Sequence, residues 1–345
     1  MNPPNPFTTD ISAFPAEKVR SLVWHNGKLM DWVSGNVEYE IDGSKRGPSI
    51  AYSYRFDAAT MSPSGKYVAL YERLGTKAIL LGLDRLPFRE INRSFYHAHV
   101  YEYPILFFGL PDGREALAHC PESYCELQIE DPETGKRWST AGTGRLQSMF
   151  HSRLAANAAG NRLLSAGWVW HPADVVRVFD LRPTPDEGGG FALELCDGCC
   201  NQGAEASSAV FNATGELIVA SVKDAEDFLE GEEGERLRPG MIGVYDLDNQ
   251  KLVSLASLEE DAGTLMAVGN RYVIGFLDHP KLIDVSTGRV LCRWPDLDTG
   301  KQASSIIWHK PLLPPIALDP GSGRFAVADE KQITVVTLDP HCLRQ

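Results

Sequence analysis

The 345-residue chain lacks the basic character that nucleic-acid binding requires. Its 33 lysine and arginine residues are outnumbered by 46 aspartate and glutamate residues, which gives a formal net charge of −13. A protein that binds nucleic acid needs a basic face, and anionic membrane surfaces likewise attract basic segments. The charge therefore disfavours nucleic acid and membrane lipid as partners, and it leaves cationic or neutral partners open.

Long apolar runs are also missing. One of the longest, YPILFFGL (103–110), is too short to cross a membrane and suits a buried strand. The start of the chain, MNPPNPFTTD, has neither the basic beginning nor the apolar core of a secretory signal peptide. Seven cysteines, an odd number in a long chain of this kind, favour reduced thiols. Together these features predict a cytoplasmic protein.

The familiar catalytic and nucleotide-binding motifs are absent from the sequence. There is no G-x-S-x-G, no H-E-x-x-H, no Walker A motif and no Rossmann fingerprint. The segment GTGRL (142–146) lacks the helix and the lysine of a phosphate-binding loop. A binding protein is therefore more strongly predicted than an enzyme, although an active site can also be assembled from loops far apart in sequence.

What the sequence does contain is a repeated turn. In MSPSGKYVAL (61–70) a glycine follows polar residues and precedes an apolar run. Glycine suits such a turn because a tight hairpin needs a positive φ, which glycine adopts without steric cost. The pattern recurs at intervals of 38 to 55 residues, and its glycines are Gly27, Gly65, Gly113, Gly160, Gly215, Gly269 and Gly323.

A second turn lies later in several of these units. DPETGKRW (131–138) and DVSTGRVL (284–291) share the form Asp-x-x-Thr-Gly-basic, and DLDNQKLV (246–253) is a degenerate version. Two hairpins in phase, repeated roughly every 50 residues, are typical of β-propeller blades. We therefore predict a single all-β domain over residues 1–345, a seven-bladed β-propeller of four-stranded antiparallel blades.

The two ends of the chain are predicted to meet in one blade. The last unit lacks an outer strand, and a ring that is not closed leaves unpaired strand edges. The segment FTTDISAF (7–14) is the expected donor of the missing strand. Surface insert loops are predicted near 182–190, 223–240 and 296–315, where the blades exceed the basic repeat.

The repeated turn resembles that of known propellers. MSPSGKYVALY is similar to the fsPdGkyla strand pair of bacterial WD40-like and YVTN-type repeat proteins, and DVSTGRVL is similar to their D..tGk.v hairpin. Residues 151–181 also resemble uncharacterised bacterial WD40-like proteins. The resemblance implies a propeller that acts as a non-catalytic protein- or peptide-binding scaffold, regulatory or immunity-type protein. No Gly-His opens a blade and no Trp-Asp closes a third strand, so no functional residue is transferred.

One candidate binding segment is GWVWHP (167–172). Strand alternation places Trp168 and Trp170 on the same side, and Pro172 ends the strand beside His171. Exposed tryptophans are enriched at binding surfaces. We predict that these three residues, Trp168, Trp170 and His171, contact a partner, with core packing between blades as the alternative.

The acidic insert DAEDFLEGEEGE (224–235) is the second candidate. It contains Glu230, Glu232 and Glu233, and its spacing does not match an EF-hand loop. Such a loop is either simply solvated or a docking element for a basic partner. We assign these three glutamates to the predicted partner-binding site.

Metal chemistry is the alternative function. CDGCC places Cys196, Cys199 and Cys200 in one turn, where ordinary loop thiols are favoured over a zinc site or redox chemistry because no fourth ligand lies nearby. His97 and His99 would share one face of a possible strand, and with His119 they could hold a metal at a central channel. A metal-assisted hydrolase or lyase would follow from that arrangement, and a small-ligand sensor is the third function that the sequence leaves open. The preferred prediction includes neither a metal nor another cofactor.

Overall fold

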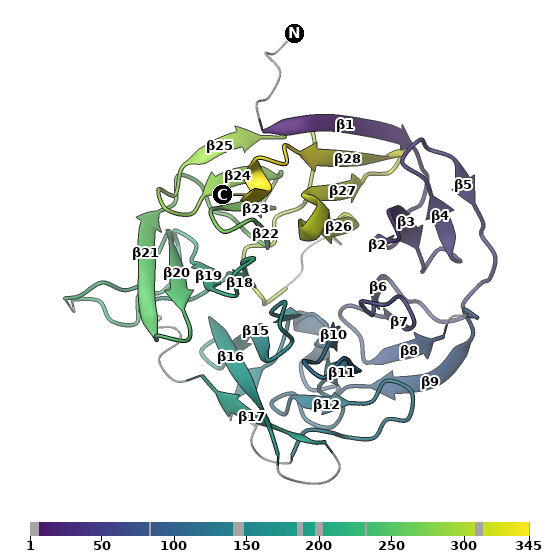
Figure 1. Ribbon diagram of the computed structural model, residues 1–345, viewed down its shortest axis with the longest axis horizontal. Helices are drawn as coiled ribbons and strands as arrows, with labels where there is room; N and C mark the ends of the chain where they lie inside the picture. Colours follow the sequence, from purple (N-terminus) through teal and green to yellow (C-terminus); the bar gives the residue numbers. More distant parts are fainter. Residues whose placement is uncertain are drawn as a thin grey trace.

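The strands form seven separate antiparallel sheets arranged as blades around a central axis (Figure 1). The computed structural model describes residues 7–82, 84–140, 148–184, 189–196, 203–231, 233–307 and 313–344. Helical structure in these ranges consists of three short 3-10 turns: η1 (Ala98–Val100), η2 (Pro320–Ser322) and η3 (Cys342–Arg344). None of the described helical segments is long and apolar enough to cross a membrane. The predicted seven-bladed, all-β propeller is confirmed.

Blades 1 to 3 follow one another from β2 to β12. Blade 1 contains β2 (Val23–His25), β3 (Lys28–Asp31), β4 (Val37–Tyr39) and β5 (Lys45–Arg46). Blade 2 contains β6 (Ala58–Met61), β7 (Val68–Tyr71), β8 (Lys77–Leu81) and β9 (Pro87–Asn92). Blade 3 contains β10 (Ile105–Gly109), β11 (Glu115–His119) and β12 (Gln128–Glu130), and a bridge between Glu130 and Arg137 marks its outer edge.

Blades 4 to 6 continue the ring. In blade 4 the inner strand is divided into β13 (Met149–Phe150) and β14 (Leu154–Ala156), which both pair with β15 (Arg162–Val169), followed by β16 (Ala173–Pro183) and β17 (Phe191–Leu195). Blade 5 contains β18 (Ser208–Phe211), β19 (Leu217–Ala220), β20 (Met241–Asp246) and β21 (Lys251–Ser257). Blade 6 contains β22 (Leu265–Val268), β23 (Tyr272–Gly275), β24 (Lys281–Asp284) and β25 (Val290–Arg293).

Blade 7 closes the ring with strands from both ends of the chain. Its order is β1 (Thr8–Pro15), β28 (Gln332–Leu338), β27 (Arg324–Ala328) and β26 (Ile316–Asp319). β1 pairs antiparallel with β28, from Ile11 opposite Val336 to Pro15 opposite Gln332. The predicted closure is therefore confirmed, with the expected segment as the donor.

The repeated glycines hold the hairpins between the first and second strands of the blades. All seven turn glycines have positive φ, from 62° to 87°, so the predicted reason for glycine at these positions is correct. At Gly160 an added Cβ would also lie 1.9 Å from the carbonyl oxygen of Gly109 in the neighbouring blade. The second turns are confirmed as well: the Asp131 carboxylate accepts hydrogen bonds from the backbone amides of Glu133 and Thr134, at 2.8 and 2.9 Å.

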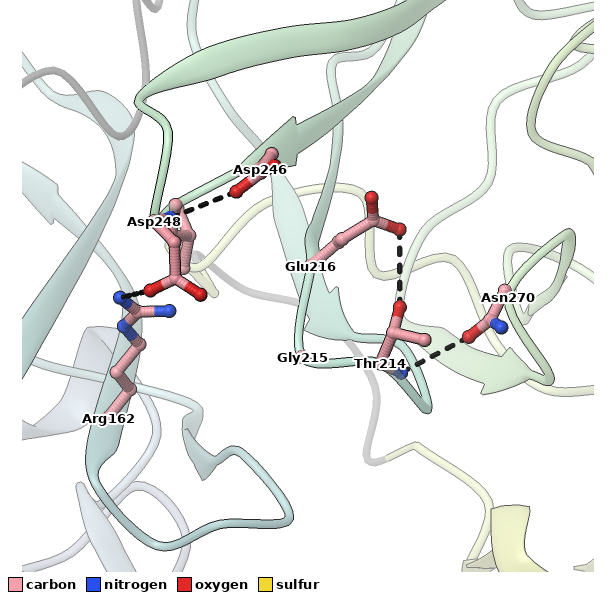
Figure 2. A pocket seen from close by; sticks show the side chains of 8 residues that line it. Arg162, Thr214, Gly215, Glu216, Asp246, Asp248 and Asn270 are labelled. Atoms are coloured by element: carbon pink, nitrogen blue, oxygen red, sulfur yellow. Dashed lines mark hydrogen bonds and ion pairs between the residues drawn. The ribbon is translucent and has the colours of Figure 1, made fainter.

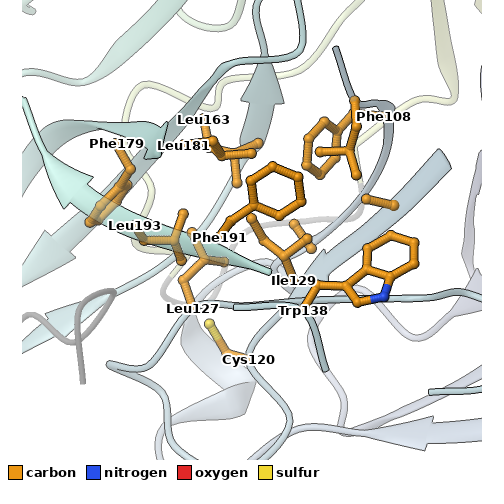
Figure 3. Close-up of a cluster of buried hydrophobic side chains, with 13 residues drawn as sticks. Phe108, Cys120, Leu127, Ile129, Trp138, Leu163, Phe179, Leu181, Phe191 and Leu193 are labelled. Atoms are coloured by element: carbon orange, nitrogen blue, oxygen red, sulfur yellow. The ribbon is translucent and has the colours of Figure 1, made fainter. Parts of the chain in front are cut away.

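Burial follows the position of a strand within its blade. All residues of the second strands β19 and β23 are buried, because these strands are covered on both faces by neighbouring blades. The outer strand β21 is instead exposed or half-buried along its whole length. The core therefore consists of layers between blades. Figure 3 shows one such layer, where Phe108 and Ile129 of blade 3 face Leu163, Phe179 and Leu193 of blade 4.

The alternating strand directions give the ring two different faces. The glycine turns and the Asp-x-x-Thr-Gly turns lie on one face, which we call the turn face. The connections between second and third strands, and those between blades, lie on the other, which we call the loop face. Two of the three predicted inserts belong to the loop face: 223–240 joins β19 to β20, and 296–315 joins β25 to β26. The third, 182–190, joins β16 to β17, and its residues 185–188 lie outside the described ranges.

Candidate functional site

Aromatic side chains gather on the loop face where blades 3 and 4 meet. Phe150 and Trp168 are directly opposite each other on β13 and β15, and their rings stack with centroids 3.9 Å apart. Tyr124 stacks on Phe150 at 4.1 Å, and Tyr101 packs edge-on against it at 5.4 Å. We call the whole group the aromatic cluster; its members are Tyr96, His97, Tyr101, Tyr124, Phe150, Trp168 and Trp170.

The expected exposure of Trp168 is wrong. Its side chain is 0 % exposed, because the short strand β13 pairs with the loop-face end of β15 and brings Phe150 onto the indole. Trp170 does contact Trp168, with ring centroids 5.3 Å apart, but it follows the end of β15 and is 41 % exposed. His171 is exposed and adopts a φ of 100° in the same turn. Trp168 is thus a buried support, and Trp170 and His171 remain at the surface.

Two exposed aromatic residues beside this turn were not predicted as site residues from the sequence. Phe95 is 84 % exposed and Tyr96 is 41 % exposed, both in the connection from β9 to β10. The Tyr96 ring lies 5.9 Å from Phe150 and 6.5 Å from Trp170, between ring centroids. The available signal was the run FYHAH in a connection between blades. We call Phe95, Tyr96 and Trp170 the exposed aromatic surface.

The acidic insert is anchored at its base. Asp227 pairs with the buried Arg236 at 2.7 Å, and this guanidinium lowers the pKa of the aspartate. The amide of Glu226 donates to the Glu205 carboxylate at 2.9 Å, and the amide of Phe228 donates to a backbone carbonyl at 2.7 Å. Beyond this base, Glu230 and Glu233 are exposed, while Glu232 lies outside the described residues.

Glu205 links the insert to the hairpin that carries Trp170. Its carboxylate also accepts a hydrogen bond from the amide of Asp174, at 3.1 Å, and Asp174 lies at the start of β16 just after the turn of Trp170 and His171. The two sequence-predicted elements therefore lie on the same face and are joined through one carboxylate.

The connection from blade 6 to blade 7, predicted as a surface insert loop at 296–315, is buried over part of its described length. Residues 299–307, which we call the crossing segment, pass over the centre of the ring (Figure 1). Ile306 forms a β-bridge with Tyr101, and the amide of Ile307 donates to the Val100 carbonyl at 2.6 Å. The segment is buried at Thr299, Gln302, Ser305, Ile306 and Ile307. Composition could not reveal this, because these partners lie about 200 residues earlier, in the connection between blades 2 and 3.

Asp174 holds the crossing segment in place. Its buried carboxylate accepts hydrogen bonds from both the amide of Ser305, at 2.9 Å, and the Ser305 hydroxyl.

We expect Asp174→Ala to lower the free energy of local unfolding of the crossing segment by about 1–3 kcal/mol, because buried donors lose their acceptor. Hydrogen exchange measured by mass spectrometry should then increase in peptides covering 299–307. Asp248→Ala, which removes an exposed partner of Arg162 on the turn face, serves as the control and should leave this exchange unchanged.

The candidate metal ligands do not converge. His97 immediately precedes the 3-10 turn η1 and His99 lies within it, so the predicted strand is wrong there, and their ring centroids lie 6.2 Å apart. His119 is buried in blade 3, with its Nε2 3.1 Å from a Glu130 oxygen. Cys196 is buried at the end of β17, and Cys199 and Cys200 lie outside the described residues. Within the described ranges no three His, Cys, Asp or Glu residues meet as a metal site would require.

The turn face carries a polar groove of about 370 Å³ between blades 4, 5 and 6 (Figure 2). Arg162 pairs with Asp248 at 2.6 Å, and the amide of Thr214 donates to the Asn270 side chain at 3.1 Å. These contacts join successive blades. The polar residues that line the groove therefore stabilise the packing of neighbouring blades.

Comparison with known proteins supports the fold. No protein-family model matches the chain, and no curated protein matches it in sequence. A chain of the structure titled "Crystal Structure of Mitotic Checkpoint Complex" is similar with a TM-score of 0.56 and 11% sequence identity, over 98% of this chain and 93% of that one. The computationally designed Ika8 protein has a TM-score of 0.47 and 12% identity, over 92% of this chain and 95% of that one, which is too low to bear on the fold. The similarity to the first of these structures thus agrees with the seven-bladed β-propeller fold described above.

Proposed function

We propose that this propeller is a non-catalytic protein-interaction module that binds a protein or peptide partner on its loop face. The observation that carries the proposal is the exposed aromatic surface above the buried stack of Phe150 and Trp168. Large aromatic side chains with a rigid backing are the usual anchors of protein interfaces, because they bury much area at little entropic cost. The similarity to a chain from a mitotic checkpoint complex agrees with a role in assemblies, as an analogy of fold.

The proposed partner is basic. Glu230 and Glu233 are exposed on the same face as the aromatic anchors, and the chain carries a net charge of −13. Glu232 is included in this surface on its sequence position alone. Opposite charge on a partner would accelerate encounter, while the aromatic residues would determine the rate of dissociation. Neither nucleic acid nor a membrane is proposed as a partner.

We place this function in the cytoplasm of a bacterial cell. The bacterial part rests on the resemblance of the repeated turns to bacterial WD40-like proteins. The cytoplasmic part is supported by the seven cysteines, an odd number that favours reduced thiols. Among the described residues, Cys120, Cys125 and Cys342 are buried and form no disulfide. The metal-dependent alternative finds no supporting observation among the described residues.

The test compares the wild-type protein with the double variant Phe95→Ala/Trp170→Ala. Loss of two anchors is expected to weaken partner binding by about thirtyfold or more, mainly through faster dissociation. The partner is captured by affinity purification from the native cells, and its binding to each purified variant is then measured by surface plasmon resonance. Phe88→Ala is the matched control, because Phe88 is also 41 % exposed but lies on the outer strand β9.

A second variant tests the acidic insert. Glu230→Gln/Glu233→Gln keeps the anchoring pair of Asp227 and Arg236 and removes only exposed charge. This variant should slow association and make the association rate less dependent on salt, with less effect on dissociation.

The outcome that contradicts the proposal concerns the aromatic variant. If Phe95→Ala/Trp170→Ala binds the partner as tightly as Phe88→Ala does, the loop-face site is wrong.

A further inference from the structure

A cavity of about 460 Å³ occupies the loop-face half of the central channel. Inner strands of blades 2 to 7 contribute to its wall, and the crossing segment contributes Thr299 and Gln302. Its volume lies within the range of small-molecule sites in proteins. The cavity is separate from the exposed aromatic surface, and the proposed protein interaction makes no use of it.

The wall of this cavity combines apolar and cationic side chains. Apolar side chains come mainly from the inner strands and from the connection that follows the crossing segment, and they include Leu106, Val210, Leu265, Leu313, Ile316 and Leu318. The charged residues in the wall are Arg73, Arg153 and Glu102. Two guanidinium groups against one carboxylate leave an excess of positive charge, inside a chain whose net charge is −13.

Arg153 lacks a carboxylate partner within the described ranges. Its Nε donates to the carbonyl of Ala166 at 3.1 Å and its Nη2 to the carbonyl of Ser207 at 2.6 Å. The residue also has a φ of 43°, which a non-glycine residue seldom adopts, at the break between β13 and β14. Two backbone carbonyls thus fix the guanidinium at the cavity wall and leave its charge uncompensated.

Arg73 is only partly neutralised. Its guanidinium lies 3.8 Å from the Glu102 carboxylate, which is longer than a hydrogen bond, and a quarter of its side chain remains exposed. Burial acts to lower the pKa of Arg73, but nearby Glu102, Tyr71 and Asp57 act in the opposite direction, and the pKa is raised overall. An anion in the cavity would offer the guanidinium the hydrogen bonds that Glu102 does not form.

Arg93 makes this part of the wall rigid. Arg93 is buried and has no carboxylate partner within the described ranges. Its guanidinium donates hydrogen bonds to the backbone carbonyls of two cavity-lining residues, Arg73 at 3.4 Å and Glu102 at 3.2 Å. Its charge also faces the rings of Tyr101 and Tyr103, at 4.5 and 5.0 Å from their centroids. A site whose charged groups are held in position before binding loses little entropy when a ligand enters.

We propose that the axial cavity binds a small organic acid, with its carboxylate between Arg73 and Arg153 and its apolar body against the inner strands. Arginine is suited to carboxylates because its planar guanidinium can donate two parallel hydrogen bonds. The apolar wall favours a ligand with a hydrocarbon or aromatic body over a bare inorganic anion. In addition, the hydroxyls of Tyr103 and Ser208 in the wall are buried and have no hydrogen-bond partner among the described residues.

The experiment measures binding of butanoate, octanoate and phenylacetate to the full chain by titration calorimetry and thermal shift. Octanamide serves as the neutral counterpart of octanoate, and inorganic phosphate as an anion without an apolar body. We expect at least one of the three acids to bind and raise the melting temperature. We also expect octanamide and phosphate to bind at least about tenfold more weakly than that acid, because each lacks one half of the recognition.

Three variants and one control locate the site. Arg73→Gln and Arg153→Gln should each weaken binding of the acid about tenfold or more. Arg271→Gln, which removes an arginine that pairs with Asp284 near the turn face, is the matched control and should leave binding unchanged. Because Arg153 also holds two carbonyls, Ala209→Leu provides a separate test: it keeps all charges and places a larger side chain in the cavity wall, so it should also abolish binding.

The proposal is overturned if none of the three acids binds, or if octanamide binds as well as octanoate. It is equally overturned if binding survives both Arg73→Gln and Ala209→Leu. Stronger binding of phosphate than of every acid would replace the organic acid by an inorganic anion, which also contradicts the proposal. None of these outcomes bears on the protein partner, because the purified chain is tested alone.

Discussion

Replacing Trp168 with alanine is expected to lower the free energy of unfolding by about 3–5 kcal/mol, the usual cost of deleting a large buried aromatic side chain. Trp168 is 0 % exposed and stacks on Phe150 with planes 6° apart. Its removal leaves a cavity under the loop face and also removes an aromatic pair that contributes about 0.5–1.5 kcal/mol. The loss is measured by urea unfolding followed by circular dichroism.

Trp170→Ala is the matched control for this prediction. Trp170 is 41 % exposed, so its loss should cost about 1 kcal/mol, close to the average of single substitutions. Trp168→Phe should recover much of the stability, since a smaller ring can keep the stack on Phe150. Equal losses for Trp168→Ala and Trp170→Ala would place Trp170 in the core and remove it from the proposed binding surface.

The architecture could be predicted because its determinants are local in sequence. A hairpin turn with a positive φ requires glycine or a similarly permissive residue, and the seven turn glycines therefore mark the blades directly. The closing strand followed from counting strands in the last unit. The Asp-x-x-Thr-Gly turns were equally local, since Asp131 and Asp284 accept hydrogen bonds from backbone groups two residues further along the chain.

The candidate sites could be predicted only in part because they depend on contacts between distant segments. Strand alternation placed Trp168 and Trp170 on the same side, and their rings do contact each other. The exposure of Trp168, however, depended on β13, a two-residue strand without a sequence signal. The crossing segment is buried because it contacts Asp174 and Tyr101, which lie far from it in the sequence. The axial cavity is lined by Arg73, Arg153 and other residues from six blades, so no local sequence motif could have predicted it.

Removing residues 1–15 is expected to lower the melting temperature by about 5–10 °C, because the ring loses its closing strand. β1 forms the outer strand of blade 7 and pairs with β28 over most of its length. Phe14 on β1 is 5 % exposed and packs against Tyr39 of blade 1, with ring centroids 6.0 Å apart. Deletion therefore removes packing between blades 7 and 1. The loss of a buried Phe side chain alone lowers the free energy of unfolding by about 3–5 kcal/mol. Thermal unfolding measured by circular dichroism gives the change.

Two further variants separate the packing of β1 from its pairing. Phe14→Ala keeps the strand and removes only the buried ring, so it should account for part of the loss; Ile11→Ala, at a position 53 % exposed on the same strand, should change the melting temperature little. The truncated protein should also associate at higher concentration, because β28 then presents an unpaired edge to other chains. A truncated chain that melts at the wild-type temperature and stays monomeric would show that the ring remains closed without β1.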